Sequence, residues 1–403
     1  MLRAQVYDTG NDALTDKLKE KFSNVFSETL GKLDVEPVDD LELIKELPKI
    51  VKYSYNPETN DLIKNEVDKM FEQGILVLDN DVEYISNFTL ARKKNGNVRP
   101  CMDLRRLNSA VKARVTILPE FNDIIRKIAG KSSYFSLDFS NSFLQIPISK
   151  RMQKYLAVFT YRGIAKFTRL PFGYINSTYI WNNTLENILG PIYSLNIVSY
   201  VDDVLGFADS HEELWNLASR ILSSIEKHGG KLNVEKSKFF CSEITYLAHD
   251  WGCFGYRPTL TATKRLVEYP RPKNRTETRR FLGMIAFYRR HVKNLYLDAG
   301  PIINLVKKSS EFTWTTQCEE SFNLLKHRLT SREILSSPRF GDLFILFVDG
   351  SQHGAGSMLM QYKSKEHEVA DKGKYEFKDM NLIAYFSKRF QKGKLAKAAF
   401  RQC

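Results

Sequence analysis

Two adjacent acidic residues interrupt an apolar run near the middle of the chain. The run Ile197–Phe207 reads Ile-Val-Ser-Tyr-Val-Asp-Asp-Val-Leu-Gly-Phe and carries Asp202 and Asp203. A third acid, Asp138, lies in the similar run Tyr134–Phe139. Both runs have the β-branched and aromatic residues that are typical of strands. Burying carboxylates among such residues is costly unless a cation or a partner compensates them. We therefore expect a compensating cation or partner beside these strands.

A divalent metal site would meet that demand. Two strands that present their acids to a common point would hold two Mg²⁺ ions, an arrangement that clamps both oxygens of an in-line phosphoryl displacement. Spacing alone does not establish this proximity, because Asp138 stands 64 residues before Asp202. Adjacent aspartates also mark turns and helix N-caps, and Asp39-Asp40 is expected to be such a turn. For Asp202-Asp203, the β-rich flanks and the second buried acid favour the metal site.

The charge of the chain is unevenly distributed. Residues 1–90 carry 10 Lys and Arg against 19 Asp and Glu, a net charge of −9, and the rest of the 403-residue chain carries +22. A basic body of this kind suits a polyanionic partner, although ribosome association or simple solubility would also explain it. The length and the 43% hydrophobic content predict more than one domain with ample core material.

Cysteine usage and hydropathy limit the compartment. The five cysteines are far apart and form no C-x-x-C pair, which favours a reducing compartment without structural zinc. The N-terminus lacks an apolar signal core, and the longest apolar run, Leu343–Val348, is too short to span a bilayer. We therefore expect an intracellular protein that does not bind a membrane.

Periodicity places several elements. A strand pair is predicted at Tyr84–Arg92 and Val98–Leu104, because the turn Asn95-Gly96 lies between them. A β-rich segment is expected to start near Phe340. Apolar residues at helical spacing predict the following helices: Leu14–Phe26, Leu62–Phe71, Ser177–Leu189, Leu214–Lys227, Thr276–Tyr288 and Glu319–Leu329.

Five segments resemble the motifs of reverse transcriptases. Tyr200-Val201-Asp202-Asp203 resembles their Y-x-D-D box. Arg99–Asn108 resembles the fingers motif, and Ser136–Ile146 resembles the first catalytic motif. Leu170–Gly173 resembles the box that supports the incoming nucleotide, and Phe281–Arg290 resembles the thumb helix of gypsy-type LTR retrotransposons. They occur in family order over about residues 60–400, and their joint occurrence is far more specific than any single motif.

The resemblance implies an α/β (α+β) fold, the right-hand polymerase of fingers, palm and thumb followed by an incomplete RNase H-like domain. The expected boundaries are an acidic N-terminal extension at 1–60, fingers and palm at 61–255, thumb at 256–338 and a truncated RNase H-like domain at 339–403. Asp138 and Asp202 would be the principal ligands of two Mg²⁺ ions, with Mn²⁺ as an alternative, and Asp203 would be the supporting carboxylate.

Residues for the incoming deoxynucleotide are also implied by the resemblance: Lys93, Arg99, Phe139, Ser140, Phe143 and Phe172. The two cations flank the predicted hairpin turn and would grip phosphates, with an exposed basic hairpin as the alternative and Lys94 as a rival to Lys93. Phe143 would exclude a 2′-hydroxyl by collision, and Phe172 would pack under the nucleotide; both also fit core positions. Asp103 and Arg106 are expected to form a structural charge pair.

Primer and template contacts are implied further along the chain. Leu247, Ala248 and His249 resemble the primer grip, although the family usually has glycine where Ala248 stands. Gly283 and Phe287 lie four apart, on one face of the predicted thumb helix, and would follow the minor groove of the template–primer duplex. Plain helix packing is the alternative for this pair.

The segment Phe344–Ser357 resembles the opening of an RNase H domain, with Asp349 on its first strand. The next acidic ligand should lie near the end of the chain, yet Lys392–Cys403 contains no acid. Because one carboxylate cannot hold two metal ions, either the chain stops short of its remaining ligands or the nuclease is defunct. We expect no RNase H activity from the chain as it stands.

The sequence therefore predicts an RNA-directed DNA polymerase from a gypsy-like LTR retrotransposon, one piece of a longer polyprotein. Expected partners are an RNA or DNA template with a primer, deoxynucleoside triphosphates and other polyprotein products. The expected location is the cytoplasm, in virus-like particles, or the nucleus. Two alternatives stay open: a catalytically silent nucleic-acid-binding protein derived from such an element, and an RNA polymerase that shares the palm.

Overall fold

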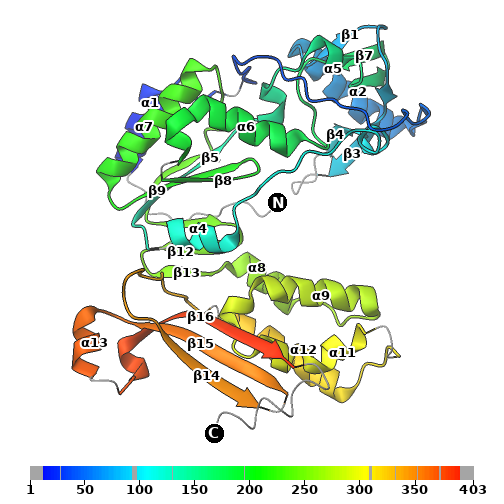
Figure 1. Ribbon diagram of the computed structural model, residues 1–403. Coiled ribbons are helices and arrows are strands. Elements are labelled where there is room, and N and C mark those ends of the chain that lie inside the picture. The colour runs from blue at the N-terminus through cyan, green and yellow to red at the C-terminus, as the bar shows by residue number, and fades with distance from the viewer. Residues whose placement is uncertain are drawn as a thin grey trace. The chain divides into compact units, whose positions relative to one another are not determined.

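The computed structural model describes residues 12–390, apart from 28, 93–97, 129, 195, 308–310, 332, 352 and 372–373 and the side chains of 92, 98, 99 and 194. The chain forms two compact units (Figure 1). The N-terminal unit contains the described residues within 10–120 and 134–240, and the C-terminal unit contains those within 121–133 and 241–403. A short stretch from the first half of the chain therefore belongs to the C-terminal unit.

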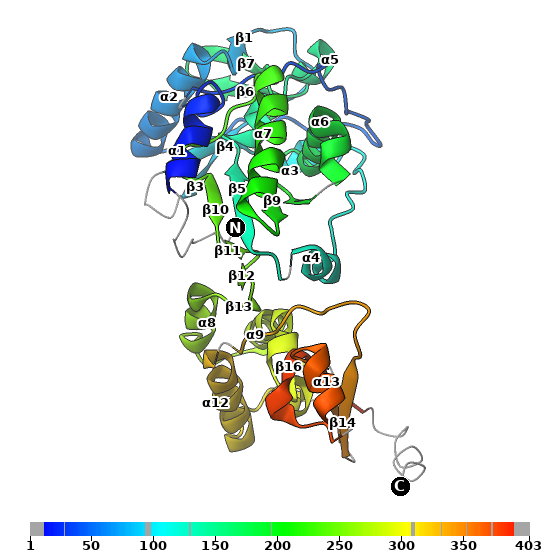
Figure 2. The same ribbon diagram turned by 90° about the vertical axis from the view of Figure 1, so that its left-hand side faces the viewer.

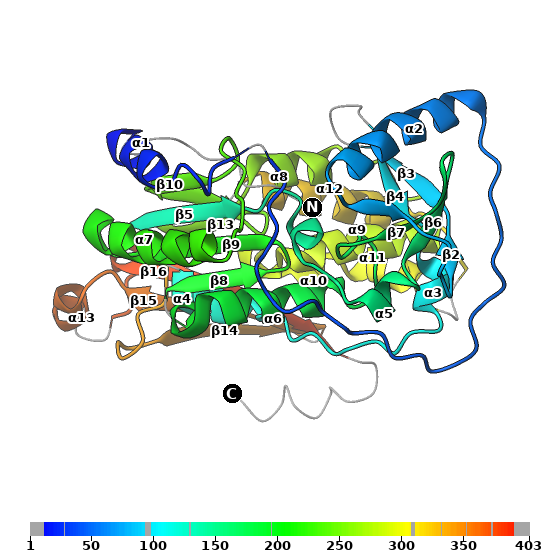
Figure 3. The same ribbon diagram turned by 90° about the horizontal axis from the view of Figure 1, so that it is seen from above.

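A four-stranded sheet forms the centre of the N-terminal unit. Its strand order is β10 (Lys238–Cys241), β5 (Ser133–Asp138), β9 (Asp203–Ala208) and β8 (Ile197–Tyr200). Helices α6 (Ser177–Leu189) and α7 (His211–Lys227) lie over this sheet (Figures 1 and 3). The α7 helix begins at Ser210, whose side chain accepts a hydrogen bond from the Glu213 N–H, and it buries Leu214, Ile221 and Ile225. Both helices confirm the predictions made from periodicity.

A second sheet of this unit has the order β1 (Leu76–Leu78), β7 (Gly163–Phe167), β6 (Ala157–Thr160) and β2 (Ile85–Ser86). The predicted strand pair is confirmed as the antiparallel strands β3 (Phe88–Arg92) and β4 (Val98–Met102), whereas the Asn95-Gly96 turn lies outside the described residues. Helix α2 (Pro57–Glu72) is capped by the Asn56 side chain and starts with proline at its first turn. The shorter helical elements of this unit are α3 (Arg105–Asn108), η1 (Ser142–Gln145), α5 (Lys150–Gln153) and η2 (Gly190–Ser194).

The N-terminal segment packs into the core of the same unit. Helix α1 (Asp12–Lys21) ends five residues earlier than predicted, because the chain then turns and Phe26 forms a bridge with Leu232. Side chains that are at most 3% exposed join the segment to the central core: Leu18, Phe22, Val25 and Leu33. The acidic composition of residues 1–60 thus coexists with buried apolar positions.

Two expectations about acidic residues are wrong. Asp39-Asp40 is not a local turn or cap: Asp39 pairs with Arg151 at 2.6 Å and Asp40 pairs with Arg114 at 2.8 Å, both far along the chain. Asp103 does not pair with Arg106. It accepts two hydrogen bonds from the Arg105 guanidinium, at 2.8 and 2.7 Å, and this partner lowers the pKa of Asp103 to about 2.

The C-terminal unit begins with the antiparallel sheet β11 (Glu243–Tyr246), β12 (His249–Gly252) and β13 (Gly255–Pro258). A helical group follows, in which α8 (Leu260–Val267), α9 (Arg275–Phe287) and α12 (Thr316–Thr330) gather together (Figure 2). They bury a shared core that includes Phe281, Ile285, Phe322 and Leu325. The connecting elements are η3 (Arg289–His291), α10 (Leu295–Asp298) and α11 (Gly300–Leu305).

Helix α4 (Phe121–Ile128) joins this unit from the first half of the chain. The Phe121 ring lies 4.9 Å from the His249 ring, 5.9 Å from Trp251 and 6.0 Å from Phe287, measured between centroids. The packing partners of α4 therefore come from residues that follow it by more than a hundred positions.

The predicted β-rich segment is confirmed as the antiparallel sheet β14 (Ile345–Ser351), β15 (Gly354–Tyr362) and β16 (Met380–Arg389). Helix α13 (Lys365–Asp371) and η4 (Phe377–Asp379) connect the last two strands. Across the part of the chain that the structure describes, no helix has the length and apolar character needed to cross a membrane.

Candidate active site

Asp138 is the last residue of β5, and its backbone is fixed on both sides. Its N–H donates to Ser237 Oγ at 3.2 Å, and its carbonyl accepts from the Asn233 N–H at 2.8 Å. The side chain is 29% exposed, and one carboxylate oxygen lies 3.6 Å from Lys236 Nζ. The carboxylate is thus half-buried at the strand end, with an ammonium group beside it.

Asp202 and Asp203 lie at the turn between β8 and β9. Tyr200 pairs with Asp203, which leaves Val201 and Asp202 as the two turn residues. Val201 has a φ of 61°, in the left-handed region that a β-branched residue rarely adopts. Such a conformation costs about 1–3 kcal/mol and persists only where the surroundings impose it. The strained turn projects two half-buried carboxylates from one end of the hairpin.

The strands that carry the acids are neighbours. Strands β5 and β9 are hydrogen-bonded in the central sheet, so Asp138 and Asp203 belong to adjacent strands. A Cβ at Gly206 would collide with the ring of Phe135, so glycine at this position of β9 leaves the space that the ring occupies. Among the described residues, however, no three His, Cys, Asp or Glu side chains are close enough to hold a metal ion. The donors are hard oxygens that suit Mg²⁺, and their convergence on a shared ion stays a prediction.

Aromatic rings surround the loop that follows Asp138. Phe143 is 8% exposed, and its ring centroid lies 5.5 Å from that of Phe172 and 6.3 Å from that of Trp181. Phe139, 6% exposed, packs edge-on against Trp181 at 4.8 Å. The structure therefore brings three of the predicted nucleotide residues into one aromatic group, where each also contributes to the core.

The backbone of Ser140 is already engaged. Its N–H donates to the Lys231 carbonyl at 3.1 Å, and its carbonyl accepts from Gln145 Nε2 at 2.9 Å. Sequence reasoning missed Gln145, although a fully buried amide inside an apolar motif was a usable signal. Of the two predicted phosphate-gripping cations, Lys93 lies outside the described residues, and for Arg99 only the backbone is described, paired with Ala91 in the β3–β4 hairpin.

The predicted primer-grip residues form the turn between β11 and β12. Tyr246 pairs with His249, so Leu247 and Ala248 occupy the turn with φ values of 49° and 62°. Two residues with positive φ characterise a type I′ hairpin turn, in which Asn and Gly are preferred. His249 is fully buried, its Nδ1 faces the Leu247 carbonyl at 3.0 Å, and burial lowers its pKa to about 4. His249 is therefore a neutral structural anchor of this turn at physiological pH.

Substitutions at Ala248 should reveal the strain of this turn. Ala248→Val is expected to reduce the free energy of unfolding by about 2 kcal/mol or more, because a buried β-branched residue tolerates positive φ worse than alanine does. Ala248→Gly is expected to stay within about 1 kcal/mol of the wild type, since relief of the left-handed conformation offsets the lost methyl group. Urea unfolding measures both. Equal stability of the two variants would contradict the argument.

Gly283 and Phe287 lie on an exposed stripe of α9. A Cβ placed on Gly283 would meet nothing within 4 Å among the described residues, so close helix packing does not explain this glycine. Phe287 is 46% exposed, while one side of its ring contacts His249 at 5.6 Å. This geometry is compatible with the predicted surface role of both residues, which stays a prediction.

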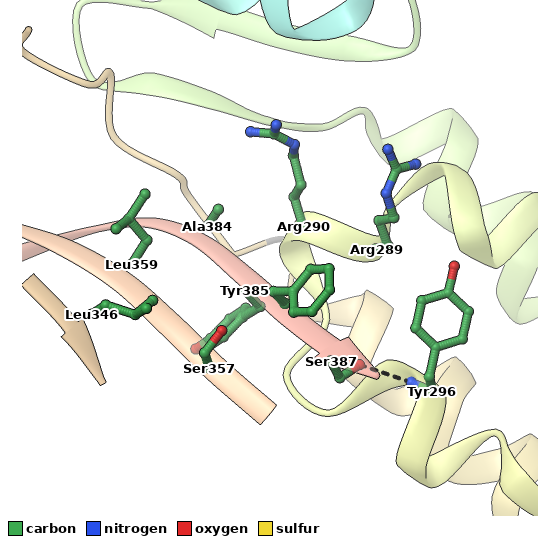
Figure 4. Close-up of a pocket in the computed structure, with 10 residues that line it drawn as sticks. Arg289, Arg290, Tyr296, Leu346, Ser357, Leu359, Ala384, Tyr385 and Ser387 are labelled. Atoms are coloured by element: carbon green, nitrogen blue, oxygen red, sulfur yellow. Dashed lines mark hydrogen bonds between the residues drawn. The ribbon is translucent and has the colours of Figure 1, made fainter. Parts of the chain in front are cut away.

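Asp349 lies on the exposed end of β14, where it pairs with Gly356 of β15. The same unit contains a pocket of about 510 Å³ (Figure 4). Arg289 and Arg290 extend on one side of it, and the β14–β16 sheet forms the other. At one end the Tyr296 N–H donates to Ser387 Oγ at 3.0 Å. None of the residues predicted for the metals, the nucleotide or the primer grip lines this pocket.

Family comparisons agree with this arrangement. Residues 91–285 match a family described as reverse transcriptase (RNA-dependent DNA polymerase), and this range includes Asp138, Asp202 and Asp203. Residues 314–402 match a family described as RNase H-like domain found in reverse transcriptase. The chain therefore contains reverse transcriptase and RNase H-like domains of the kind present in the Pol polyproteins of transposons. The second match starts upstream of the predicted boundary at residue 339 and takes in α12.

Individual relatives are Pol polyproteins of mobile elements. The protein is 26% identical over 379 residues to the retrovirus-related Pol polyprotein from transposon opus of Drosophila melanogaster, covering 89% of this chain and 38% of that one. The polyprotein from transposon 412 of the same organism is 26% identical over 417 residues, covering 97% and 32%. The chain thus spans about a third of the length of these curated relatives.

Among solved structures, the foamy viral protease-reverse transcriptase in complex with double-stranded DNA superposes with a TM-score of 0.81 at 19% identity, covering 96% of this chain and 79% of that one. This likeness confirms the predicted fold class, a right-hand polymerase with an RNase H-like domain.

Proposed function

We propose that this protein is an RNA-directed DNA polymerase that acts as one part of a retrotransposon Pol polyprotein. The observation that carries the proposal is the adjacency of β5, which ends at Asp138, and β9, which begins at Asp203 directly after the turn residue Asp202. Bound divalent ions, Mg²⁺ or Mn²⁺, would neutralise charge on the attacking primer oxygen and on the departing pyrophosphate. Asp138 and Asp202 would hold them, and Asp203 would add negative field.

The residues around the carboxylates support this role. Lys236 compensates the charge of Asp138 at 3.6 Å, and this contact would open when the same carboxylate engages a cation. The +22 charge of residues 91–403 suits a template–primer duplex. The arginines of α9 and η3 would contact its phosphates and so position the duplex without reading its sequence. The thumb-like segment Phe281–Arg290 supports a gypsy-type element as the source.

Primer extension tests the proposal. Purified chain, a primed RNA or DNA template, Mg²⁺ and deoxynucleoside triphosphates are expected to give template-directed incorporation, and Asp202→Asn is the comparison. Identical incorporation by both proteins would show that the enzyme claim is wrong. Salt-dependent binding of template–primer without incorporation would favour the silent nucleic-acid-binding protein instead.

Replacing Phe143 should relax the choice of sugar. Because Phe143 is nearly buried, Phe143→Val opens space under the sugar with a smaller packing loss than the alanine variant. We expect the preference for deoxynucleotides over ribonucleotides to fall at least about tenfold, a loss of roughly 1.4 kcal/mol of discrimination. The matched control is Phe167→Val, which removes an equally buried ring from β7 and should leave the preference unchanged. Unrestricted ribonucleotide use by the wild type would refute the DNA-polymerase assignment.

A further inference from the structure

The loop that follows Asp138 is held by a buried amide. Gln145, at the end of η1, has no exposed surface. Its Nε2 donates to the Ser140 carbonyl at 2.9 Å and to the Lys231 carbonyl at 2.8 Å, and its Oε1 accepts from the Lys231 N–H at 2.9 Å. One side chain thus satisfies three backbone groups from two separate segments.

These bonds continue a short antiparallel pairing. The Asp138 carbonyl accepts from the Asn233 N–H at 2.8 Å, and the Ser140 N–H donates to the Lys231 carbonyl at 3.1 Å. The pairing ends where Asn141 adopts a φ of 52° and turns the chain away. The Gln145 carboxamide bridges the Ser140 carbonyl and the Lys231 N–H, two groups that a regular antiparallel pair would join directly. The loop from Ser140 to Phe143 is therefore fixed at both ends.

A glycine holds the amide in place from the other side. A Cβ at Gly31 would collide with Gln145 Oε1 and would lie 2.8 Å from Lys231 Cγ. The adjacent backbone is bonded to the same residue, because the Leu33 N–H donates to the Gln145 carbonyl at 2.8 Å. A side chain at position 31 would therefore displace the carboxamide from its present position.

We infer that Gln145 is a positioning residue for the nucleotide. It fixes the position and orientation of the Ser140–Phe143 loop, which would contact the nucleotide, relative to Asp138. The inference rests on the proposed polymerase function. The hydrogen bonds of the Gln145 side chain described above go to backbone groups of Ser140 and Lys231, so it acts through the loop that connects Asp138 to Phe143. Losing it should weaken nucleotide binding more than the chemical step.

Gln145→Met tests the inference in the full chain, since methionine keeps the volume and removes the three hydrogen bonds. Steady-state primer extension is expected to show the KM for deoxynucleotide raised at least about tenfold, with kcat changed less than about threefold. Hydrogen–deuterium exchange is expected to accelerate at least about tenfold in residues 138–146 and at Lys231, whose N–H loses its acceptor, and nowhere else in the N-terminal unit. The matched control is Gln153→Met, because Gln153 is also buried and, among the described residues, its side chain bonds only the Ile148 carbonyl, at 3.0 Å.

Gly31→Ala displaces the same amide without changing its chemistry. Its control is Gly350→Ala, where a Cβ meets nothing within 4 Å among the described residues. Gly31→Ala is expected to raise KM in the same direction. If exchange shows that Gln145→Met loosens the whole N-terminal unit, the Gly31→Ala variant is the deciding test. Faster exchange near Gln145 together with a higher KM for deoxynucleotide supports the inference, and an unchanged KM overturns it. Unchanged exchange in residues 138–146 of Gln145→Met also overturns it. Failure of the wild type to extend a primer would refute the proposed function, while the exchange result would still decide whether Gln145 holds the loop.

Discussion

The Asp202→Asn variant is expected to incorporate deoxynucleotides at least about 10³-fold more slowly than the wild type. The substitution removes one full negative charge and one hard oxygen ligand from the turn between β8 and β9. Loss of several kcal/mol of transition-state charge stabilisation corresponds to about three powers of ten in rate. Raising the Mg²⁺ concentration should recover only part of this loss.

Stability provides the control for this variant. Asp202 is a half-buried turn residue, and asparagine is at least as favourable as aspartate in turns, so the unfolding temperature should stay within about 2 °C of the wild type. Asp61→Asn makes the same chemical change on the exposed face of α2 and should leave incorporation unchanged. An inactive Asp61→Asn variant, or a normally active Asp202→Asn variant, would contradict the assignment.

A chain that lacks residues 1–34 is expected not to fold. Leu18, Phe22, Val25 and Leu33 are at most 3% exposed and belong to the core of the N-terminal unit. Burying such side chains contributes about 1.5–3 kcal/mol each, or roughly 6–12 kcal/mol together. That sum is comparable to the whole stability of a typical domain, about 5–15 kcal/mol.

Circular dichroism and thermal melting would measure the effect of this truncation. Leu33→Ala alone is expected to destabilise the chain by about 2–5 kcal/mol, because the cavity it leaves is fully enclosed. Leu62→Ala, at a position that is 39% exposed, is the matched control and should cost less than about 1 kcal/mol. Cooperative melting of the truncated chain at the wild-type temperature would show that the segment is dispensable.

Local patterns were sufficient for much of the fold. The helix Ser177–Leu189 matches its prediction residue for residue, since its apolar spacing and its glycine at the C-terminal end act within one segment. The strands around Asp138 and Asp202-Asp203 could be identified because acids inside apolar runs are rare. Their adjacency needed the structure, because no local signal orders β5 beside β9.

Long-range contacts explain what the sequence could not provide. Asp39 and Asp40 have the composition of a turn, yet their partners Arg151 and Arg114 are more than 70 residues away. Asp103 forms its ion pair with Arg105 rather than with Arg106, because the position at which α3 begins decides which of the two arginines lies beside it. The amide of Gln145 inside an apolar motif was a visible signal, but its partners are backbone groups of Ser140 and Lys231, and backbone groups leave no trace in side-chain patterns.

The composition of the C-terminal unit has a consequence for synthesis of the chain on the ribosome. Helix α4 is translated before the other helices and strands of this unit. The ring of Phe121 stays uncovered until His249 and Trp251 have been synthesised. At about 5–20 residues per second, the delay is on the order of ten seconds. During that interval the apolar surface of α4 is available to chaperones. The surface that is exposed during synthesis therefore differs from the surface that solvent contacts in the folded protein.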